Sequence, residues 1–217
     1  MTISNAIGIL GGSFDPIHIG HLRMAHELAQ QLSLPKVHLI PSHQPVHRGA
    51  PLATPQQRLE MLALATADNP LFMVDPREIN REGPSYTIDT LIELKRELPN
   101  TTLCLFLGMD AFLGLHTWHR HEELLHYAHV IVAQRPSYPP PANNTDSGIG
   151  PWLKNQKQAD LAFIKAQNAG GILFLPTTCL DISSSAIRKE IAMGGNPRYL
   201  LPNDVYLYTQ LNGTYRR

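Results

Sequence analysis

The sequence is poor in cysteine and carries no net charge, and each scarcity excludes a class of protein. Its two cysteines, Cys104 and Cys179, are too few for a disulfide framework, and Cys104 lies in an apolar run where a buried thiol is common. Lysine plus arginine and aspartate plus glutamate number 18 each, so no overall field draws the protein to nucleic acid or an anionic membrane. Any site for anions must therefore be local.

Long apolar runs and a targeting segment are also missing. No run approaches the roughly 20 apolar residues that span a bilayer, and the N-terminus has no basic segment followed by an apolar one. We therefore expect a cytoplasmic protein without a membrane partner. The length suits one α/β domain, and we expect residues 1–217 to form it, with a loop and a helix inserted at about 136–170.

Short apolar runs alternate with segments of helical periodicity along the chain. Predicted strands cover residues 6–10, 36–40, 71–74, 103–107, 130–133 and 171–175. Predicted helices cover residues 22–32, 55–67, 88–98, 152–168, 184–193 and 203–211, the second of them opened by a capping box of Thr54 and Gln57. The alternation predicts a doubly wound, mostly parallel α/β sheet with helices on both faces, in which ligands bind beyond the carboxyl ends of the strands.

The segment between the first strand and the first helix predicts a triphosphate site. Gly11 and Gly12 form the expected turn, and His18 and His21 stand where the helix begins. Glycine has no Cβ, so the turn can bring backbone amides up to a phosphate, and the free N–H groups of the helix favour negative charge. The imidazoles lie on one side of the first helical turn, with only a hydrogen at Gly20 between them.

A second helix N-terminus near the end of the chain has the same character. Ser183 and Ser185 stand where a helix begins, and such hydroxyls can cap its amides and donate to phosphate oxygens. Arg188, one turn later, offers a planar guanidinium to the same anion. The alternative is an ordinary capped helix with an exposed arginine, and for Ser184 we adopt that interpretation.

Taken together, the motifs resemble those of the nucleotidyltransferase superfamily, whose members use an H-x-G-H motif to transfer AMP from ATP. Within it, they are most similar to the bacterial nicotinate mononucleotide adenylyltransferases, over nearly the whole chain. The resemblance is carried by residues 11–21 and by Pro45-Val46-His47-Arg48, Ser85-Tyr86-Thr87, Gly108-Met109-Asp110, Trp118, Arg135-Pro136 and residues 182–188. It implies a Rossmann-like fold and transfer of AMP to nicotinate mononucleotide, giving nicotinate adenine dinucleotide and pyrophosphate in NAD biosynthesis.

The resemblance also assigns roles to individual residues. ATP binding falls to Gly11, Gly12, Ser13, Phe14, His18, His21, Gly108, Asp110, Ser183, Ser185 and Arg188. Mononucleotide binding falls to Ser42, His47, Arg48, Thr87, Trp118 and Arg135. Two positions depart from the family pattern: Val46 replaces a proline, which leaves the roles of His47 and Arg48 open, and Ser185 replaces a frequent threonine but keeps the hydroxyl.

The implied reaction needs donors of hydrogen bonds rather than a nucleophilic side chain. The attacking mononucleotide phosphate is already anionic, so the difficulty is to bring two polyanions together and stabilise the leaving pyrophosphate. We expect His18, His21 and Arg188 to be catalytic, the imidazoles at the α- and β-phosphates and the guanidinium on pyrophosphate. Mg²⁺ would enter with ATP, held mainly by the phosphates, and no protein metal site is expected.

The second substrate is expected to meet a helix N-terminus and an indole. A helix beginning near Thr87 offers N–H groups that suit the carboxylate of nicotinate better than the amide of nicotinamide, and Trp118 offers a stacking face. Arg135 would take the mononucleotide phosphate. Plainer interpretations remain open: a core role for Trp118, a helix cap for Asp110 and a surface arginine at position 135.

Other functions fit the sequence less well. A protease-type zinc site fails because His121 and His126 are five residues apart, which turns them about 140° from each other on a helix. A dinucleotide-dependent oxidoreductase would need a G-x-G-x-x-G turn and an acidic residue near Ile40. A phosphopantetheine adenylyltransferase gives no reason for Trp118, and a regulatory module without turnover stays open. The sequence leaves the oligomeric state undecided, with a homo-oligomer allowed.

Overall fold

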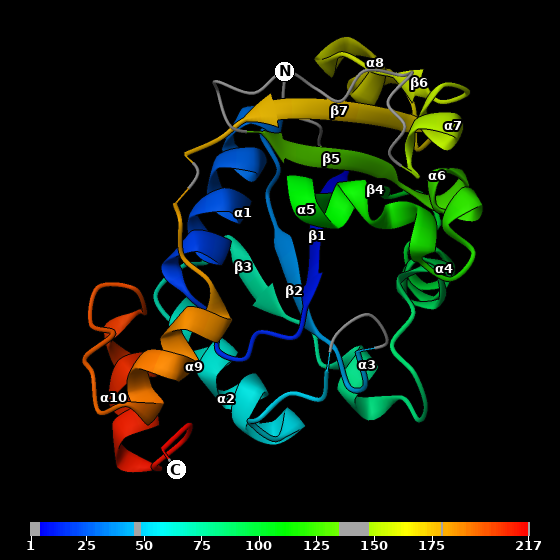
Figure 1. Ribbon diagram of the computed structural model, residues 1–217. Coiled ribbons are helices and arrows are strands. Elements are labelled where there is room, and N and C mark those ends of the chain that lie inside the picture. Colours follow the sequence, from blue (N-terminus) through cyan, green and yellow to red (C-terminus); the bar gives the residue numbers. More distant parts are fainter. Residues whose placement is uncertain (1–4, 46–48, 135–147, 179, 217) are drawn as a thin grey trace.

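One twisted parallel sheet organises the computed structural model, which describes residues 5–45, 49–134, 148–178 and 180–216. Within these residues seven strands pair in the order β3-β2-β1-β4-β5-β7-β6, and every pairing is parallel. The twist turns β7 across the view in Figure 1, while β2 and β3 run down it. The strands are β1 (Ala6–Gly12), β2 (Val37–Pro41), β3 (Phe72–Val74), β4 (Thr102–Gly108), β5 (His129–Gln134), β6 (Lys157–Gln158) and β7 (Gly171–Pro176). The predicted doubly wound α/β fold is therefore confirmed.

Helices connect the strands and close the chain. They are α1 (Ile19–Leu32), α2 (Pro55–Thr66), α3 (Arg77–Asn80), α4 (Thr87–Glu97), α5 (Met109–Leu113), α6 (Leu124–Tyr127), α7 (Gly150–Leu153), α8 (Leu161–Ala166), α9 (Ser184–Ala192) and α10 (Asn203–Leu211), with 3₁₀ turns η1 (Leu115–Thr117) and η2 (His121–Glu123). The predicted capping box is present: the Thr54 hydroxyl accepts from the Gln57 amide, and the Gln57 side chain accepts from the Thr54 amide. Among the described residues, none of the helices combines the length and hydropathy of a membrane span.

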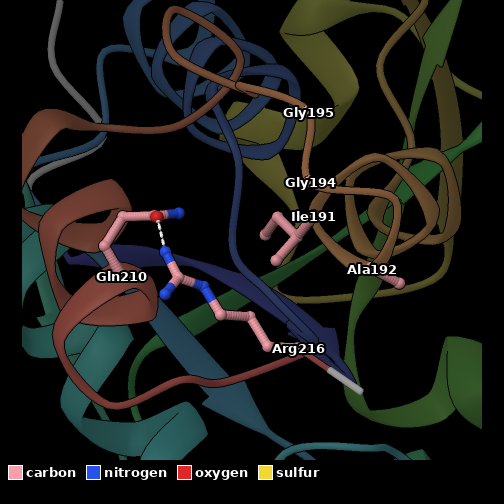
Figure 2. A pocket seen from close by; sticks show the side chains of 6 residues that line it. All are labelled: Ile191, Ala192, Gly194, Gly195, Gln210 and Arg216. Carbon is pink, nitrogen blue, oxygen red and sulfur yellow. Dashed lines mark hydrogen bonds between the residues drawn. The ribbon is translucent and has the colours of Figure 1, made fainter.

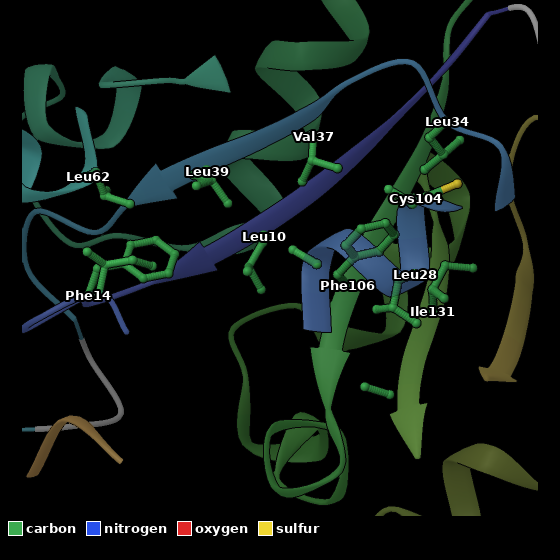
Figure 3. Close-up of a cluster of buried hydrophobic side chains, with 14 of the residues drawn as sticks. Leu10, Phe14, Leu28, Leu34, Val37, Leu39, Leu62, Cys104, Phe106 and Ile131 are labelled. Atoms are coloured by element: carbon green, nitrogen blue, oxygen red, sulfur yellow. The ribbon is translucent and has the colours of Figure 1, made fainter. Parts of the chain in front are cut away.

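Alternate side chains of the strands build a core on each face of the sheet. Cys104 and Phe106 of β4 pack with α1, α2, α9 and α10, the face that Figure 3 draws. Leu103, Leu105 and Leu107 of the same strand pack on the opposite face with α4, α5 and α6. Each buried leucine contributes about 1.5–3 kcal/mol, so burial on both faces stabilises the sheet. Burial also raises the pKa of the Cys104 thiol to about 12, and Cys179 lies outside the described residues.

A close contact inside this core requires glycine in the first strand. A Cβ on Gly8 would lie 2.7 Å from the Phe106 ring and 3.1 Å from a Val37 methyl group. Real side chains do not approach so closely, so Gly8 makes room for the ring of β4. This glycine, which precedes the motif of residues 11–21, therefore serves packing.

The predicted helix over residues 152–168 is wrong. The structure has the short α7, then β6 at the edge of the sheet, then α8. The segment between the two helices is polar, and residues 157–158 pair with β7 instead of continuing a helix. Asp160 then caps a new helix by accepting from the Phe163 amide at 2.8 Å. Side-chain capping by an aspartate marks a fresh start, and the 152–168 interpretation overlooked it.

Candidate active site

The first strand ends at an accessible stretch of backbone. Gly11 and Gly12 are the last residues of β1, where they pair with Ile40 and Pro41, so the expected glycine turn starts only at Ser13. Gly11 is exposed, and a Cβ there would meet nothing closer than the Ile40 carbonyl oxygen at 4.0 Å. The predicted approach of a ligand to bare backbone is thus sterically open at Gly11.

The two histidines of the motif stack on each other at the start of α1. His18 is the N-cap residue, and its Nδ1 accepts a hydrogen bond of 3.3 Å from the His21 amide. The ring centroids are 3.6 Å apart with planes inclined by 19°. The Phe14 ring meets His21 edge-on at 5.3 Å and is otherwise buried in the core. The expected pair of imidazoles on one side of the helix is therefore present.

Burial fixes the charge state of the first imidazole. His18 is only 5% exposed, and burial lowers its pKa to about 4. The ring is therefore neutral near pH 7. Because Nδ1 accepts from the His21 amide, the proton of the neutral ring lies on Nε2, which leaves one N–H donor for a ligand.

Gly20 lets a distant segment approach the histidines. A Cβ on Gly20 would lie 3.0 Å from His18 Nδ1 and 3.6 Å from the Cβ of Ile182. Ile182 directly precedes the second helix N-terminus predicted from the sequence. The N-terminal ends of α1 and α9, which are far apart along the chain, are thus neighbours in space.

The start of α9 is bonded to the loop between β1 and α1. Ser183 caps the helix by accepting from the Ala186 amide at 3.2 Å, and its hydroxyl lies 3.3 Å from that of Ser185. The Ser184 hydroxyl donates to the Pro16 carbonyl at 2.9 Å, a connection that our plain interpretation of Ser184 missed. Arg188 Nη1 donates to the Asp15 carbonyl at 2.7 Å. The guanidinium therefore binds the chain at Asp15, a residue three positions before His18.

Asp15 holds this loop from within, and sequence reasoning gave it no role. The residue is 4% exposed, and its carboxylate accepts from the Leu52 and Ala53 amides at 2.9 and 3.0 Å. The Tyr215 hydroxyl donates to it at 2.8 Å. These partners lie far away in the sequence, so no local pattern could have indicated them.

Arg58 of α2 is a second residue that the sequence did not reveal. Its side chain is fully buried, and it donates to the Ser13 carbonyl at 2.7 Å and to the His43 carbonyl at 3.4 Å. Burial lowers the pKa of the guanidinium, and the nearby Asp15 carboxylate raises it. Arg58 therefore joins the loop after β1 to the loop after β2.

The carboxyl end of β4 adds the predicted Gly108 and Asp110. Gly108 is the N-cap residue of α5, and no atom lies within 4 Å of the place a Cβ would occupy. Asp110 is exposed in the first turn of α5. Because Gly108 holds the cap position, the capping interpretation of Asp110 is wrong, and its carboxylate faces solvent next to an open stretch of backbone.

A second group of predicted residues gathers beyond β2. Ser42 follows the strand directly, and its buried hydroxyl has no hydrogen-bond partner among the described residues. The Ser85 hydroxyl accepts from the His43 amide at 2.8 Å, which ties this loop to the start of α4. Thr87 is the first residue of α4, and the N-cap residue Tyr86 supplies no side-chain cap for the amides of the first turn.

Trp118 lies beside this helix start. The indole is half-buried and packs against the core on the α4 face of the sheet, so the core interpretation holds for part of the side chain. Its neighbour His119 contacts the Tyr86 ring with centroids 4.3 Å apart, and Arg120 lies 3.7 Å from the Asp89 carboxylate. The structure thus brings the loop after β2, the start of α4 and residues 119–120 into contact, which places the segments of Ser42, Thr87 and Trp118 side by side.

The predicted roles of His47, Arg48 and Arg135 fall outside the described residues. In the part of the chain that the structure describes, no three histidine, cysteine or acidic side chains gather as metal ligands would.

A pocket of about 250 Å³ lies between the C-terminal end of α9 and α10, away from the α9 N-terminus. Figure 2 shows its lining: Ile191, Ala192, Gly194, Gly195, Gln210 and Arg216.

Comparison with known proteins points in one direction. A model of the cytidylyltransferase-like family matches residues 9–190. A probable nicotinate-nucleotide adenylyltransferase of Aeromonas hydrophila is 47% identical over 97% of both chains, and one of Dechloromonas aromatica is 45% identical over 99% of both. The Plasmodium falciparum nicotinic acid mononucleotide adenylyltransferase complexed with NaAD superimposes with a TM-score of 0.71 over 97% of both chains, at 17% identity.

Proposed function

The chain belongs to the cytidylyltransferase-like family and, within it, to the nicotinate-nucleotide adenylyltransferases, and we propose that the residues beyond β1, β2 and β4 carry its reaction. The enzyme transfers AMP from ATP to nicotinate mononucleotide, giving nicotinate adenine dinucleotide and pyrophosphate in NAD biosynthesis. One observation supports this assignment of the site above the others. The N-termini of α1 and α9 meet, joined by the bonds of Arg188 and Ser184 to residues 15–16.

We assign the polyphosphate of ATP to that meeting point. His18 would donate from Nε2 and His21 from its own ring, while Arg188 would hold the leaving pyrophosphate. The attacking phosphate oxygen is anionic, so no general base is needed, and catalysis rests on donors fixed before the substrate arrives. The bonds around residues 13–18 supply that fixed geometry.

Mg²⁺ fits this site as a companion of ATP. The Asp15 carboxylate already accepts three hydrogen bonds, and the described residues hold no cluster of ligands for a metal ion. We propose that phosphate oxygens hold the ion, with water completing its shell. When bound, Mg²⁺ supplies neutralisation of the negative charge on the polyphosphate.

We assign the mononucleotide to Ser42, Thr87 and Trp118, with His47, Arg48 and Arg135 contributing as the family resemblance implies. The first-turn amides of α4 suit a ring carboxylate, and the half-exposed indole suits the flat nicotinate ring. Charge-assisted bonds exceed neutral ones by about 1 kcal/mol each, so we expect at least a roughly tenfold preference for nicotinate over nicotinamide mononucleotide.

Pyrophosphate release tests the function directly. ATP and Mg²⁺ are supplied with nicotinate mononucleotide, nicotinamide mononucleotide, phosphopantetheine or no acceptor. We expect the fastest release with nicotinate mononucleotide and none without acceptor. Faster release with phosphopantetheine would contradict the assignment, and ATP binding without release for any acceptor would favour a regulatory module.

A further inference from the structure

A carboxylate lies beside the guanidinium assigned to pyrophosphate. Asp15 Oδ2 is 3.5 Å from Arg188 Nη1, while the same Nη1 donates to the Asp15 backbone carbonyl at 2.7 Å. A carboxylate and a phosphate compete for an arginine, because both accept bidentate pairs from it. If the Asp15 side chain turned fully to Arg188, the guanidinium would lose donors for its anionic substrate.

Three hydrogen bonds from donors other than Arg188 hold the Asp15 carboxylate in place. Two come from the Leu52 and Ala53 amides, and the third comes from the Tyr215 hydroxyl near the end of the chain. Tyr215 is itself buried, with 8% of its surface exposed, and it packs in the core that contains α9. Its backbone takes the left-handed conformation at φ 72°, which residues other than glycine rarely adopt. The hydroxyl is thus built into its place beside Asp15.

We propose that Tyr215 is a positioning residue for adenylyl transfer: its hydroxyl keeps the Asp15 carboxylate on the residue 52–53 amides, so that Arg188 stays available to the polyphosphate. The inference rests on the proposed role of Arg188 as the pyrophosphate ligand. Arg188 is anchored through a neutral carbonyl, and a guanidinium has five N–H donors, so most remain for a ligand. Without the hydroxyl, the Asp15 carboxylate loses a donor, and the Arg188 guanidinium, with Nη1 already 3.5 Å from Oδ2, can replace it.

The test compares two tyrosine-to-phenylalanine variants of the full chain. Tyr215→Phe removes the hydroxyl that donates to Asp15, and Tyr208→Phe removes another long-range hydroxyl, which donates to Glu60 at 2.7 Å away from the site. Calorimetry gives the dissociation constants of MgATP and of pyrophosphate. We expect Tyr215→Phe to weaken both about five- to tenfold, with the KM for nicotinate mononucleotide unchanged, and Tyr208→Phe to change neither.

A double-mutant cycle with Arg188→Lys shows whether the hydroxyl acts through the guanidinium. In the Arg188→Lys background, we expect Tyr215→Phe to leave pyrophosphate binding unchanged. The proposal is overturned if Tyr215→Phe binds both ligands as the wild type does, if Tyr208→Phe has an equal effect, or if the loss persists in full in the Arg188→Lys background. Because binding is measured without an acceptor, a wild type that binds MgATP but releases no pyrophosphate would contradict the proposed function alone.

Discussion

The two halves of the candidate site are built in different ways. The phosphate half is held by side chains from remote parts of the chain, namely the buried Arg58 of α2 and Tyr215 and the partly buried Arg188 of α9. The mononucleotide half is assembled from loop and helix-start contacts, such as Ser85 with the His43 amide and the Tyr86 ring with His119. The difference suggests a division of labour: fixed donors where charge develops, and surface shape where one ring must be told from another.

Removing a donor from the phosphate half should have the largest effect. We expect His21→Ala to lower kcat about 10²–10³-fold, as loss of one preorganised donor typically does, while the melting temperature stays close to that of the wild type. His26→Ala is the matched control, since His26 lies on the same helix beyond the phosphate-facing turn. Steady-state kinetics with both substrates saturating provide the measurement, and near-normal turnover by His21→Ala would remove the imidazole from the mechanism.

Arg58 tests whether the phosphate half depends on its buried brace. Arg58→Met leaves the Ser13 and His43 carbonyls without their donor and should lower the free energy of unfolding by about 3 kcal/mol. Urea denaturation provides the measurement. The control, Arg23→Met, removes a half-exposed guanidinium from its pair with Glu27, which keeps the Thr178 amide as a donor, and should change stability much less. Equal losses in both variants would mean that Arg58 has no special role.

Acid should lower the stability of the folded protein through His18, a residue of the phosphate half. Its pKa is lowered from 6.5 to about 4 in the folded protein, so between these values the unfolded chain binds more protons than the folded one. Stability therefore falls as the pH drops through this window, by up to about 3 kcal/mol from this residue. Denaturation at pH 7 and pH 4.5 provides the measurement.

A His18→Gln variant separates this contribution from that of the rest of the chain. It should lose less stability between the two pH values than the wild type. Some loss remains, because burial also lowers the pKa of His129, whose Nδ1 accepts from the Gly171 amide at 3.1 Å. A wild type and variant with the same pH dependence would show that His18 is not held neutral by burial.

The mononucleotide half should respond more mildly and for one substrate only. Trp118→Ala removes the stacking face and should raise the KM for nicotinate mononucleotide about tenfold, with the KM for ATP unchanged. Trp118→Phe keeps a flat ring and should recover most of the affinity. A rise in both KM values would mean that the indole supports the structure of the whole site, and it would contradict the division into a phosphate half and a mononucleotide half.

Patterns local in sequence predicted most of the architecture. Alternating apolar runs indicated the parallel sheet, and the capping box at Thr54 and the bounds of α10 match the structure. The paired imidazoles and the helix start at Thr87 were also predicted, because short spacings decide them. The failure at 152–168 came from a polar stretch that pairs with a sheet edge, which helical periodicity cannot detect.

The brace of the phosphate half could not be predicted in the same way. Asp15 and Arg58 act through partners that only the folded chain brings close, and burial of a charged side chain leaves no periodic signal. No local pattern in the sequence predicts the contact of Tyr215 with Asp15 either. The sequence did indicate the chemistry of the ligand, because amides, imidazoles and hydroxyls at helix starts are typical of sites that bind anions.

The bond between Asp15 and Tyr215 joins residues 200 positions apart. A ribosome therefore makes the glycine-rich motif first and its last support only after translating through position 215. The Asp15 carboxylate therefore gains the last of its three hydrogen-bond donors only after residue 215 has been added to the chain.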